Sequence, residues 1–160
     1  MADLFIIAVG SLREKYFRDA ADEYIKRLSA SWNVHEVEIK EEKLSASPTA
    51  AEISAALQKE GERIAAAIPK RAYSVALCVE GFAPDSVGFS SLLGDAKTAG
   101  YSSVCFIIGS ANGLSEKVKE ACLCRLSMSR MTFPHRLARV MLLEAVYRAT
   151  EIGRGSGYHK

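Results

Sequence analysis

Two segments in the C-terminal half of the chain have the residue types and spacing of a ligand site. The first, Gly109-Ser-Ala-Asn-Gly113, follows an apolar run typical of a buried strand and precedes a predicted helix. Ligands in α/β folds bind beyond the carboxyl ends of strands, and glycines let the backbone approach a ligand or adopt a positive φ. The segment matches neither the dinucleotide-binding nor the Walker pattern. It therefore fits either a nucleotide-binding turn or a simple tight turn, and the residues alone leave both open.

The second segment, Met128-Ser-Arg-Met-Thr-Phe-Pro-His135, lies between a short predicted strand and a long predicted helix. Free N–H groups at a helix N-terminus can hold a polar ligand, and a histidine at that position can act as a general base. A capping or otherwise structural role for His135 is the simpler alternative.

The end of the chain, Arg154-Gly-Ser-Gly-Tyr-His-Lys160, combines cations with an aromatic ring. Tyr158 can stack on an unpaired base while Arg154 and Lys160 meet phosphates; a disordered terminus is the alternative. From residue 125 onward there are seven Lys/Arg and two Asp/Glu, whereas the first 124 residues hold 14 basic and 17 acidic groups. A basic last quarter suits a polyanionic partner, although on charge alone we favour a solvated helix face.

Composition and cysteine spacing indicate the class of protein and argue against a membrane segment, a zinc site and a redox pair. A chain of 160 residues with 49% apolar and 25% charged residues predicts one soluble globular domain over residues 1–160. The apolar run of residues 4–9 is too short to span a membrane and lacks the flanks of a signal peptide, so we expect a cytoplasmic protein. The four cysteines match neither a zinc nor a redox pattern, so we expect reduced thiols and no metal.

Apolar periodicity predicts that strands and helices alternate along the chain. Strands are expected at residues 4–9, 34–39, 73–79, 104–108 and 125–129, and helices at residues 14–29, 48–68, 90–98, 115–121 and 134–152. Pro48 is expected in the first turn of the second helix, with Thr49 and Glu52 as a capping box. The alternation predicts an α/β domain with a mainly parallel sheet covered on both faces.

The last predicted helix carries apolar residues around most of its circumference, namely Leu137, Val140, Met141, Leu142, Leu143, Val146 and Tyr147. One face can meet the sheet, and another can meet a second copy of the chain. Glu144 and Arg148 are four positions apart, and the simplest role of Arg148 is a surface ion pair of small value.

Three C-terminal blocks in order, residues 106–115, 126–149 and 154–160, resemble the RlmH family. Ile7-Ala-Val-Gly-Ser-Leu12 and Leu77-Cys-Val-Glu-Gly81 are similar to that family as well, so the resemblance covers essentially the whole chain. Members of the family methylate N3 of a pseudouridine in helix 69 of 23S ribosomal RNA. The resemblance implies a SPOUT fold with a C-terminal trefoil knot, a homodimer, and ribosomal RNA of the 70S ribosome or large subunit as the partner, with no membrane.

The resemblance also implies which residues form the site. S-adenosyl-L-methionine would be bound by Leu77, Gly109, Met128, Ser129, Arg130, Met131, Thr132 and Phe133. The catalytic residues near the RNA target would be His135, Arg148, Tyr158 and His159, with the tail reaching into the partner's site. The methyl group would pass directly from the sulfonium to a uracil-like ring nitrogen, helped by a base (His135 or His159) or by a cation (Arg148 or Arg154).

Ser110 departs from the usual sequence of the RlmH family, which has a second glycine at this position. If the position requires a positive φ, serine strains it by about 1 kcal/mol. Three other functions therefore stay open: a SPOUT enzyme with another ribosomal or transfer RNA target, a non-catalytic RNA-binding assembly factor, and a flavodoxin-like binder of small molecules.

Overall fold

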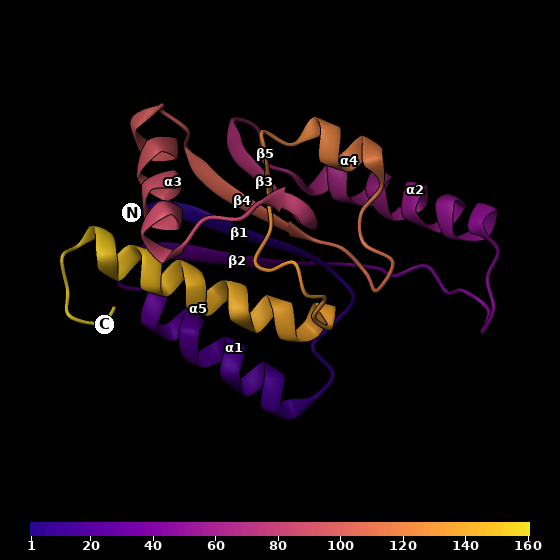
Figure 1. Ribbon diagram of the computed structural model, residues 1–160, viewed down its shortest axis with the longest axis horizontal. Coiled ribbons are helices and arrows are strands. Elements are labelled where there is room, and N and C mark those ends of the chain that lie inside the picture. Colours follow the sequence, from indigo (N-terminus) through magenta and orange to yellow (C-terminus); the bar gives the residue numbers. More distant parts are fainter.

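The computed structural model describes all 160 residues, and strands and helices alternate throughout (Figure 1). The elements are β1 (Ala2–Val9), α1 (Lys15–Leu28), β2 (Trp32–Ile39), α2 (Ala50–Ala67), β3 (Ala72–Phe82), α3 (Ser86–Thr98), β4 (Ser103–Ile108), α4 (Glu116–Ala121), β5 (Cys124–Leu126) and α5 (His135–Gly153). All pairings in the sheet are parallel, in the order β2-β1-β4-β3-β5. The predicted α/β class is confirmed. None of the helices is long and apolar enough to cross a membrane.

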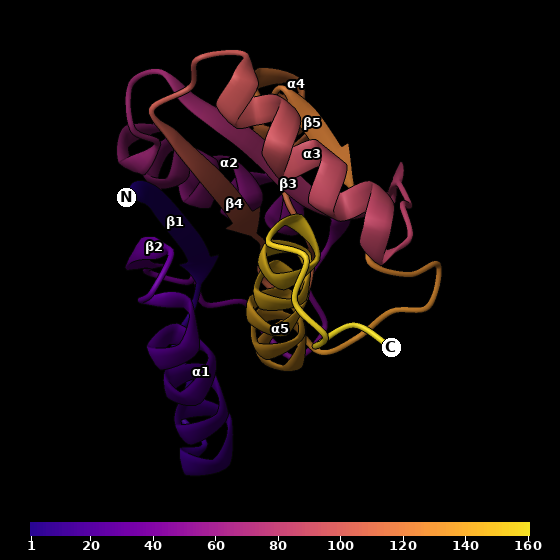
Figure 2. The same cartoon turned by 90° about the vertical axis from the view of Figure 1, so that its left-hand side faces the viewer.

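The two faces of the sheet form two separate cores because side chains alternate along each strand. In β4, Val104, Phe106 and Ile108 belong to the core beneath α1, α3 and α5, whereas Cys105 and Ile107 belong to the core beneath α2 and α4. Figures 1 and 2 show these helices as two layers with the sheet between them. This double burial explains the unbroken apolar runs of β1 and β4.

All four cysteines are free thiols. Cys105 is completely buried, and burial raises the pKa of its thiol to about 12. It therefore packs as a small apolar side chain, as its place in an apolar run predicts.

Helices α2 and α3 each begin directly after a capping residue, so their first residues differ from those predicted from the sequence. The Thr49 hydroxyl accepts from the Glu52 N–H at 3.1 Å and donates to the Glu52 carboxylate at 3.2 Å. Thr49 is therefore the N-cap, and the Glu52 carboxylate bonds its hydroxyl and not its backbone N–H, so the return bond of a capping box is not formed. Because α2 begins after this cap, the expectation that Pro48 lies in its first turn is wrong. The Asp85 carboxylate accepts from the Gly88 N–H at 2.7 Å, so α3 begins at Ser86, four residues before the predicted start.

The boundaries of β3 and β5 also differ from the prediction. β3 continues to Phe82 through an irregularity between Leu77 and Phe82, whereas β5 ends at Leu126. The Ser127 N–H donates to the Phe82 carbonyl at 2.7 Å, and the chain then leaves the sheet. From the edge strand β5 it returns to place α5 between α1 and α3 (Figure 2). The trefoil knot stays a prediction, and this return path is where it would form.

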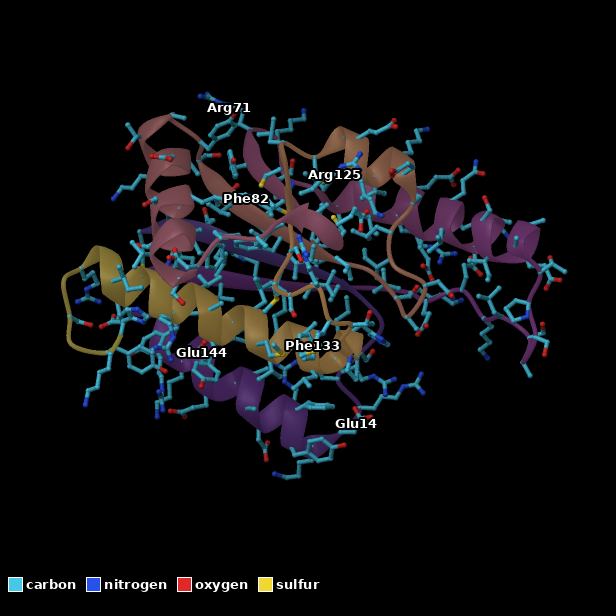
Figure 3. The ribbon with its side chains drawn as sticks, viewed as in Figure 1. Glu14, Arg71, Phe82, Arg125, Phe133 and Glu144 are labelled. Carbon is cyan, nitrogen blue, oxygen red and sulfur yellow. The ribbon has the colours of Figure 1, made fainter.

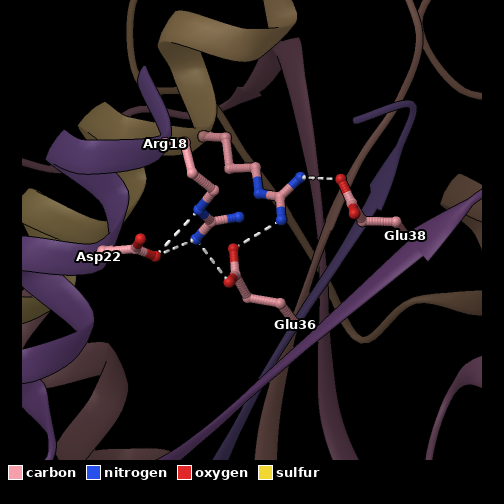
Figure 4. A network of polar contacts seen from close by, with 5 residues as sticks. Arg18, Asp22, Glu36 and Glu38 are labelled. Carbon is pink, nitrogen blue, oxygen red and sulfur yellow. Dashed lines mark hydrogen bonds and ion pairs between the residues drawn. The ribbon is translucent and has the colours of Figure 1, made fainter. Parts of the chain in front are cut away.

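A charged network fixes α5 to the sheet (Figure 4). Arg139 is 2% exposed and donates to the Glu38 carboxylate at 3.0 Å and to the Glu36 carboxylate at 2.5 Å. The second Glu36 oxygen accepts from Arg18 of α1 at 2.7 Å, and Arg18 pairs in turn with Asp22. One guanidinium on α5 is thereby joined to β2, and through β2 to α1.

We expect Arg139→Ala to lower the free energy of unfolding by about 2 kcal/mol, because Glu36 and Glu38 lose their shared cation. The cost stays below that of breaking a fully buried pair since 42% of the Glu38 side chain is exposed. Urea unfolding measures the change. The control is Lys15→Ala, which removes an exposed pair with Asp19 and should leave the free energy of unfolding almost unchanged, because solvent screens such a pair. Equal, small losses in both variants would contradict the role given to Arg139.

Candidate functional site

The carboxyl edge of the sheet holds a cavity of about 790 Å³ between the ends of β3, β4 and β5. Such a volume lies within the roughly 300–1,000 Å³ of small-molecule and cofactor sites. Most of the residues predicted to contact a cofactor line it: Leu77, Gly109, Met128, Ser129, Met131, Thr132 and Phe133. Arg130 belongs to the same segment but is not part of the lining. The fold thus brings together three loops that are distant in the sequence.

The turn after β4 is tight because Gly109 and Gly113 touch. A Cβ at Gly109 would lie 2.3 Å from the Gly113 carbonyl oxygen, closer than a side chain tolerates. The Gly113 N–H donates to the Ser110 carbonyl at 2.8 Å, and Gly113 adopts a φ of 80°. Ser110 is buried and does not have a positive φ. The condition under which serine would strain this turn is therefore not met.

Serine side chains fix the backbone of the segment between β5 and α5. The Ser127 hydroxyl donates to the Ser129 carbonyl at 2.9 Å, and the Ser129 hydroxyl accepts from the Met131 N–H at 3.0 Å. The Met131 side chain is 68% exposed although it borders the cavity. The wall formed by this segment is thus ordered by local bonds, and it presents both backbone groups and apolar side chains to a ligand.

His135 is the first residue of α5 and lines the same cavity. Its Nε2 atom is buried and has no hydrogen-bond partner. Burial lowers the pKa of the imidazole below its usual value, while the Glu41 carboxylate acts in the opposite sense. This nitrogen lies beside Gly10 at the end of β1, 3.6 Å from the position that a Cβ of Gly10 would take. A neutral imidazole with an unpartnered nitrogen is a candidate for a general base. A satisfied structural role, which the sequence left open, does not account for this nitrogen.

The other predicted catalytic residues lie together on α5 and the tail. Arg148 donates to the Glu144 carboxylate from Nε at 3.0 Å and from Nη2 at 2.7 Å, which confirms the predicted ion pair. Its guanidinium carbon lies 4.9 Å from the centre of the Tyr158 ring, and its Nη1 lies 3.3 Å from His159 Nδ1. The tail therefore folds back on its own helix.

These residues are distant from His135. Arg148 follows His135 by 13 positions on one helix, which corresponds to roughly 20 Å along the axis. Figure 3 shows Phe133 near the start of α5 and Glu144 well along it toward the tail. Within one chain, His135 and the cluster of Arg148, Tyr158 and His159 cannot contact the same small substrate.

Some residues in or near the lining of the cavity were not predicted from the sequence. Glu80 and Lys119 form an ion pair and both line the cavity. A Cβ at Gly81 would lie 2.7 Å from the carbonyl carbons of Arg125 and Leu126, so β3 and β5 approach closely only because this residue is glycine. The pair Glu80-Gly81 is typical of the end of a strand. The sequence therefore predicted neither the ion pair of Glu80 nor the close approach of β5 to Gly81. No group of three or more His, Cys, Asp or Glu side chains is placed to hold a metal ion.

Two solved structures share the fold of this chain. A probable methylase family protein from Haemophilus influenzae Rd KW20 superposes with a TM-score of 0.54, covering 98% of this chain and 70% of its own at 9% identity. A probable methyltransferase from Bordetella pertussis Tohama I also gives 0.54, covering 92% and 95% of the two chains at 17% identity. Such identities establish the fold alone, and it is a fold found among methyltransferases.

The particular family follows from the sequence comparison. The family model described as "Predicted SPOUT methyltransferase" matches residues 3–159, and the chain belongs to this family. The protein named "Ribosomal RNA large subunit methyltransferase H" of Streptococcus thermophilus (strain CNRZ 1066) is 44% identical over 97% of this chain and 98% of its own. The protein of the same name from Pelotomaculum thermopropionicum is 43% identical over 99% of both chains.

We expect Gly109→Ala to lower the free energy of unfolding by about 1–3 kcal/mol, because the new Cβ forces the turn apart. Gly94→Ala is the matched control, since Gly94 lies in α3 with nothing within 4 Å of its Cβ position. This control should raise stability by up to about 1 kcal/mol. Urea unfolding of both variants provides the test, and a stable Gly109→Ala protein would contradict the close contact with Gly113.

Proposed function

We propose that this chain transfers a methyl group from S-adenosyl-L-methionine to N3 of a pseudouridine in helix 69 of 23S ribosomal RNA, on the assembled ribosome or large subunit. The observation that carries the proposal is the 790 Å³ cavity, which is lined by three loops distant in the sequence together with His135. The names of the full-length relatives support ribosomal RNA as the substrate. An enzyme of this kind would act as a single domain in the cytoplasm, where ribosomes are found.

The residues of the cavity fit the proposed cofactor. Leu77, Met128 and Phe133 offer apolar surface for an adenine ring, while the backbone near Gly109 and Ser129 offers hydrogen-bonding groups. The contact of Gly109 with Gly113 leaves no side chain on the inner side of this turn. Bound in this cavity, S-adenosyl-L-methionine would supply a methyl group activated by its sulfonium. The chain itself would supply position and proton transfer.

His135 is our candidate for the base. N3 of a uracil-type ring carries a proton and becomes nucleophilic only when that proton leaves. The proton would pass to His135 Nε2, the N3 electron pair would form the bond to the methyl carbon, and the carbon–sulfur bond would break. The neutral, unpartnered imidazole supports this role. Arg148 would stabilise the anionic ring, and Tyr158 and His159 would position the nucleotide.

We infer that this arrangement requires a homodimer. Leu137, Met141, Glu144 and Arg148 form one half-buried stripe of α5 at helical spacing. Leu137 and Met141 belong to neither core nor its packed margin, so their apolar surface is free to meet a second copy. A partner's tail that reached the cavity would bring together the groups that are roughly 20 Å apart on one chain.

Methyl transfer from labelled S-adenosyl-L-methionine to ribosomes that lack the modification tests the proposed function. We expect label on a pseudouridine of the large-subunit RNA after the nucleotide is mapped. Label on another ribosomal site or on transfer RNA would assign a different SPOUT activity. Absence of both label and calorimetric cofactor binding would support a non-catalytic RNA-binding factor.

Deletion of residues 157–160 is expected to abolish methylation and to leave the dimer and cofactor binding intact, because only the tail cluster is lost. Light scattering, calorimetry and the methyl-transfer assay measure these three properties. Mixing this variant with a Gly109→Val variant, in which the new side chain forces apart the turn that lines its own cavity, should restore activity if a tail acts on its partner's cavity. Full activity of the truncated protein, or no recovery in mixed dimers that are shown to form, would contradict this arrangement.

A further inference from the structure

A second cavity, of about 760 Å³, lies at the same edge of the sheet between the ends of β1 and β2 and the turn after β4. It shares Ser110 and Asn112 with the first cavity. The neighbouring strands β1 and β4 lead into helices on opposite faces, because α1 covers one core and α4 the other. Their carboxyl ends thus form a topological switch point, where open α/β sheets bind ligands.

The lining of this second cavity includes a buried carboxyl group with an unused oxygen. Glu60 of α2 is 3% exposed, and its Oε2 accepts from the Glu42 N–H at 2.9 Å. Its Oε1 is buried and has no hydrogen-bond partner. Burial raises the pKa of this carboxyl; the Ser110 hydroxyl lies near enough to act in the opposite sense but completes no hydrogen bond to it. A buried acceptor without a partner is unfavourable, and a donor group of a ligand in the cavity would remove this cost.

Unpaired cations surround the same cavity. Arg13, Lys40 and Lys43 line it, are exposed and form no ion pair. Three further carboxylates line it as well: Glu38 and Glu42 are paired with Arg139 and Arg63, and Glu41 is exposed and unpaired. The loop that carries both lysines is fixed to α2, because Arg63 donates to the Lys40 carbonyl at 2.8 Å and pairs with Glu42 at 2.5 Å. Five of the lining residues are apolar. Apolar surface, one buried acceptor and several exposed cations match a nucleotide, with its flat ring, ring N–H and phosphates.

We propose that this second cavity receives the acceptor nucleotide of the RNA. Glu60 Oε1 accepts a hydrogen bond from a ring N–H, and Arg13, Lys40 and Lys43 contact the flanking phosphates. This inference rests on the proposed function, since it uses the first cavity as the cofactor site. The two cavities meet at Ser110 and Asn112, so a base in the second cavity presents one edge toward the first.

The inference makes Glu60 a residue that determines specificity. Pseudouridine has a second ring N–H, at N1, in addition to the N3 position that is methylated. Uridine bound in the same way presents a C–H at that point and cannot donate to Glu60. A site built to hydrogen-bond one substrate discriminates against an analogue that lacks the group, because its own buried polar atom is left unpaired.

The test compares wild type with Glu60→Gln on two kinds of ribosome, one with pseudouridine and one with uridine at the target. In the variant, the amide oxygen can retain the Glu42 N–H, which turns the amide N–H group toward the ring N–H. We expect wild type to prefer pseudouridine by roughly 10- to 100-fold in kcat/KM. The variant should lose this preference to within about threefold, through a slower reaction on pseudouridine alone. Glu62→Gln, at an exposed position on the same helix, should retain the wild-type preference.

Thermal unfolding and calorimetric binding of S-adenosyl-L-methionine confirm that the Glu60→Gln protein is folded. A folded variant that retains the preference, or that slows equally on both ribosomes, overturns the role of Glu60. A wild type that is inactive on both ribosomes overturns the proposed function and this inference with it. As a second variant, Lys43→Ala should leave the preference unchanged and reduce the slope of log KM against log salt by about one charge; an unchanged slope removes Lys43 from phosphate binding.

Discussion

The buried guanidinium of Arg139 is the interaction on which the geometry of this edge depends. It lies one helical turn after His135, so the same contacts with Glu36 and Glu38 that join α5 to β2 also hold His135 over the ends of β1 and β4. A buried charge of this kind is costly unless it is paired. The pairing thus selects one orientation of α5, and with it one position for the unpartnered imidazole nitrogen.

The turn after β4 divides the carboxyl edge into two binding spaces. β4 is bordered by β1 and by β3, and the helix after β4 lies on the opposite face from the helices that follow those two strands. A crevice therefore opens on each side of the Gly109–Gly113 turn. One has the loops and volume of a cofactor cavity, and the other has a buried carboxyl among exposed cations. Ser110 and Asn112 line both cavities and form their common wall.

Sequence periodicity predicted the parts of the fold in which burial alone sets the pattern. β1 and β4 are apolar on both faces, and the last helix is apolar on most sides, so each was located closely. Boundaries set by single side chains, such as the Asp85 cap, were missed. Glu60 was also missed, because it lies among the charged residues Lys59 and Glu62 and reads as a surface position. Its burial arises from a loop that is distant in the sequence.

The resemblance located the lining of the first cavity and assigned the tail to the RNA target. It did not predict that the tail folds back onto α5, because Glu144, which accepts from the Tyr158 hydroxyl, is one carboxylate among many in the sequence.

The parallel pairing of β1 with β4 has a further consequence for how the chain acquires its structure. Residues 3–8 find their partners about 100 positions later, at residues 103–108. Closing so long a segment is slow, and during synthesis the central ladder has to wait until two thirds of the chain has emerged. The protein should therefore fold late and as one unit, with neither cavity present in an N-terminal fragment that ends before β4.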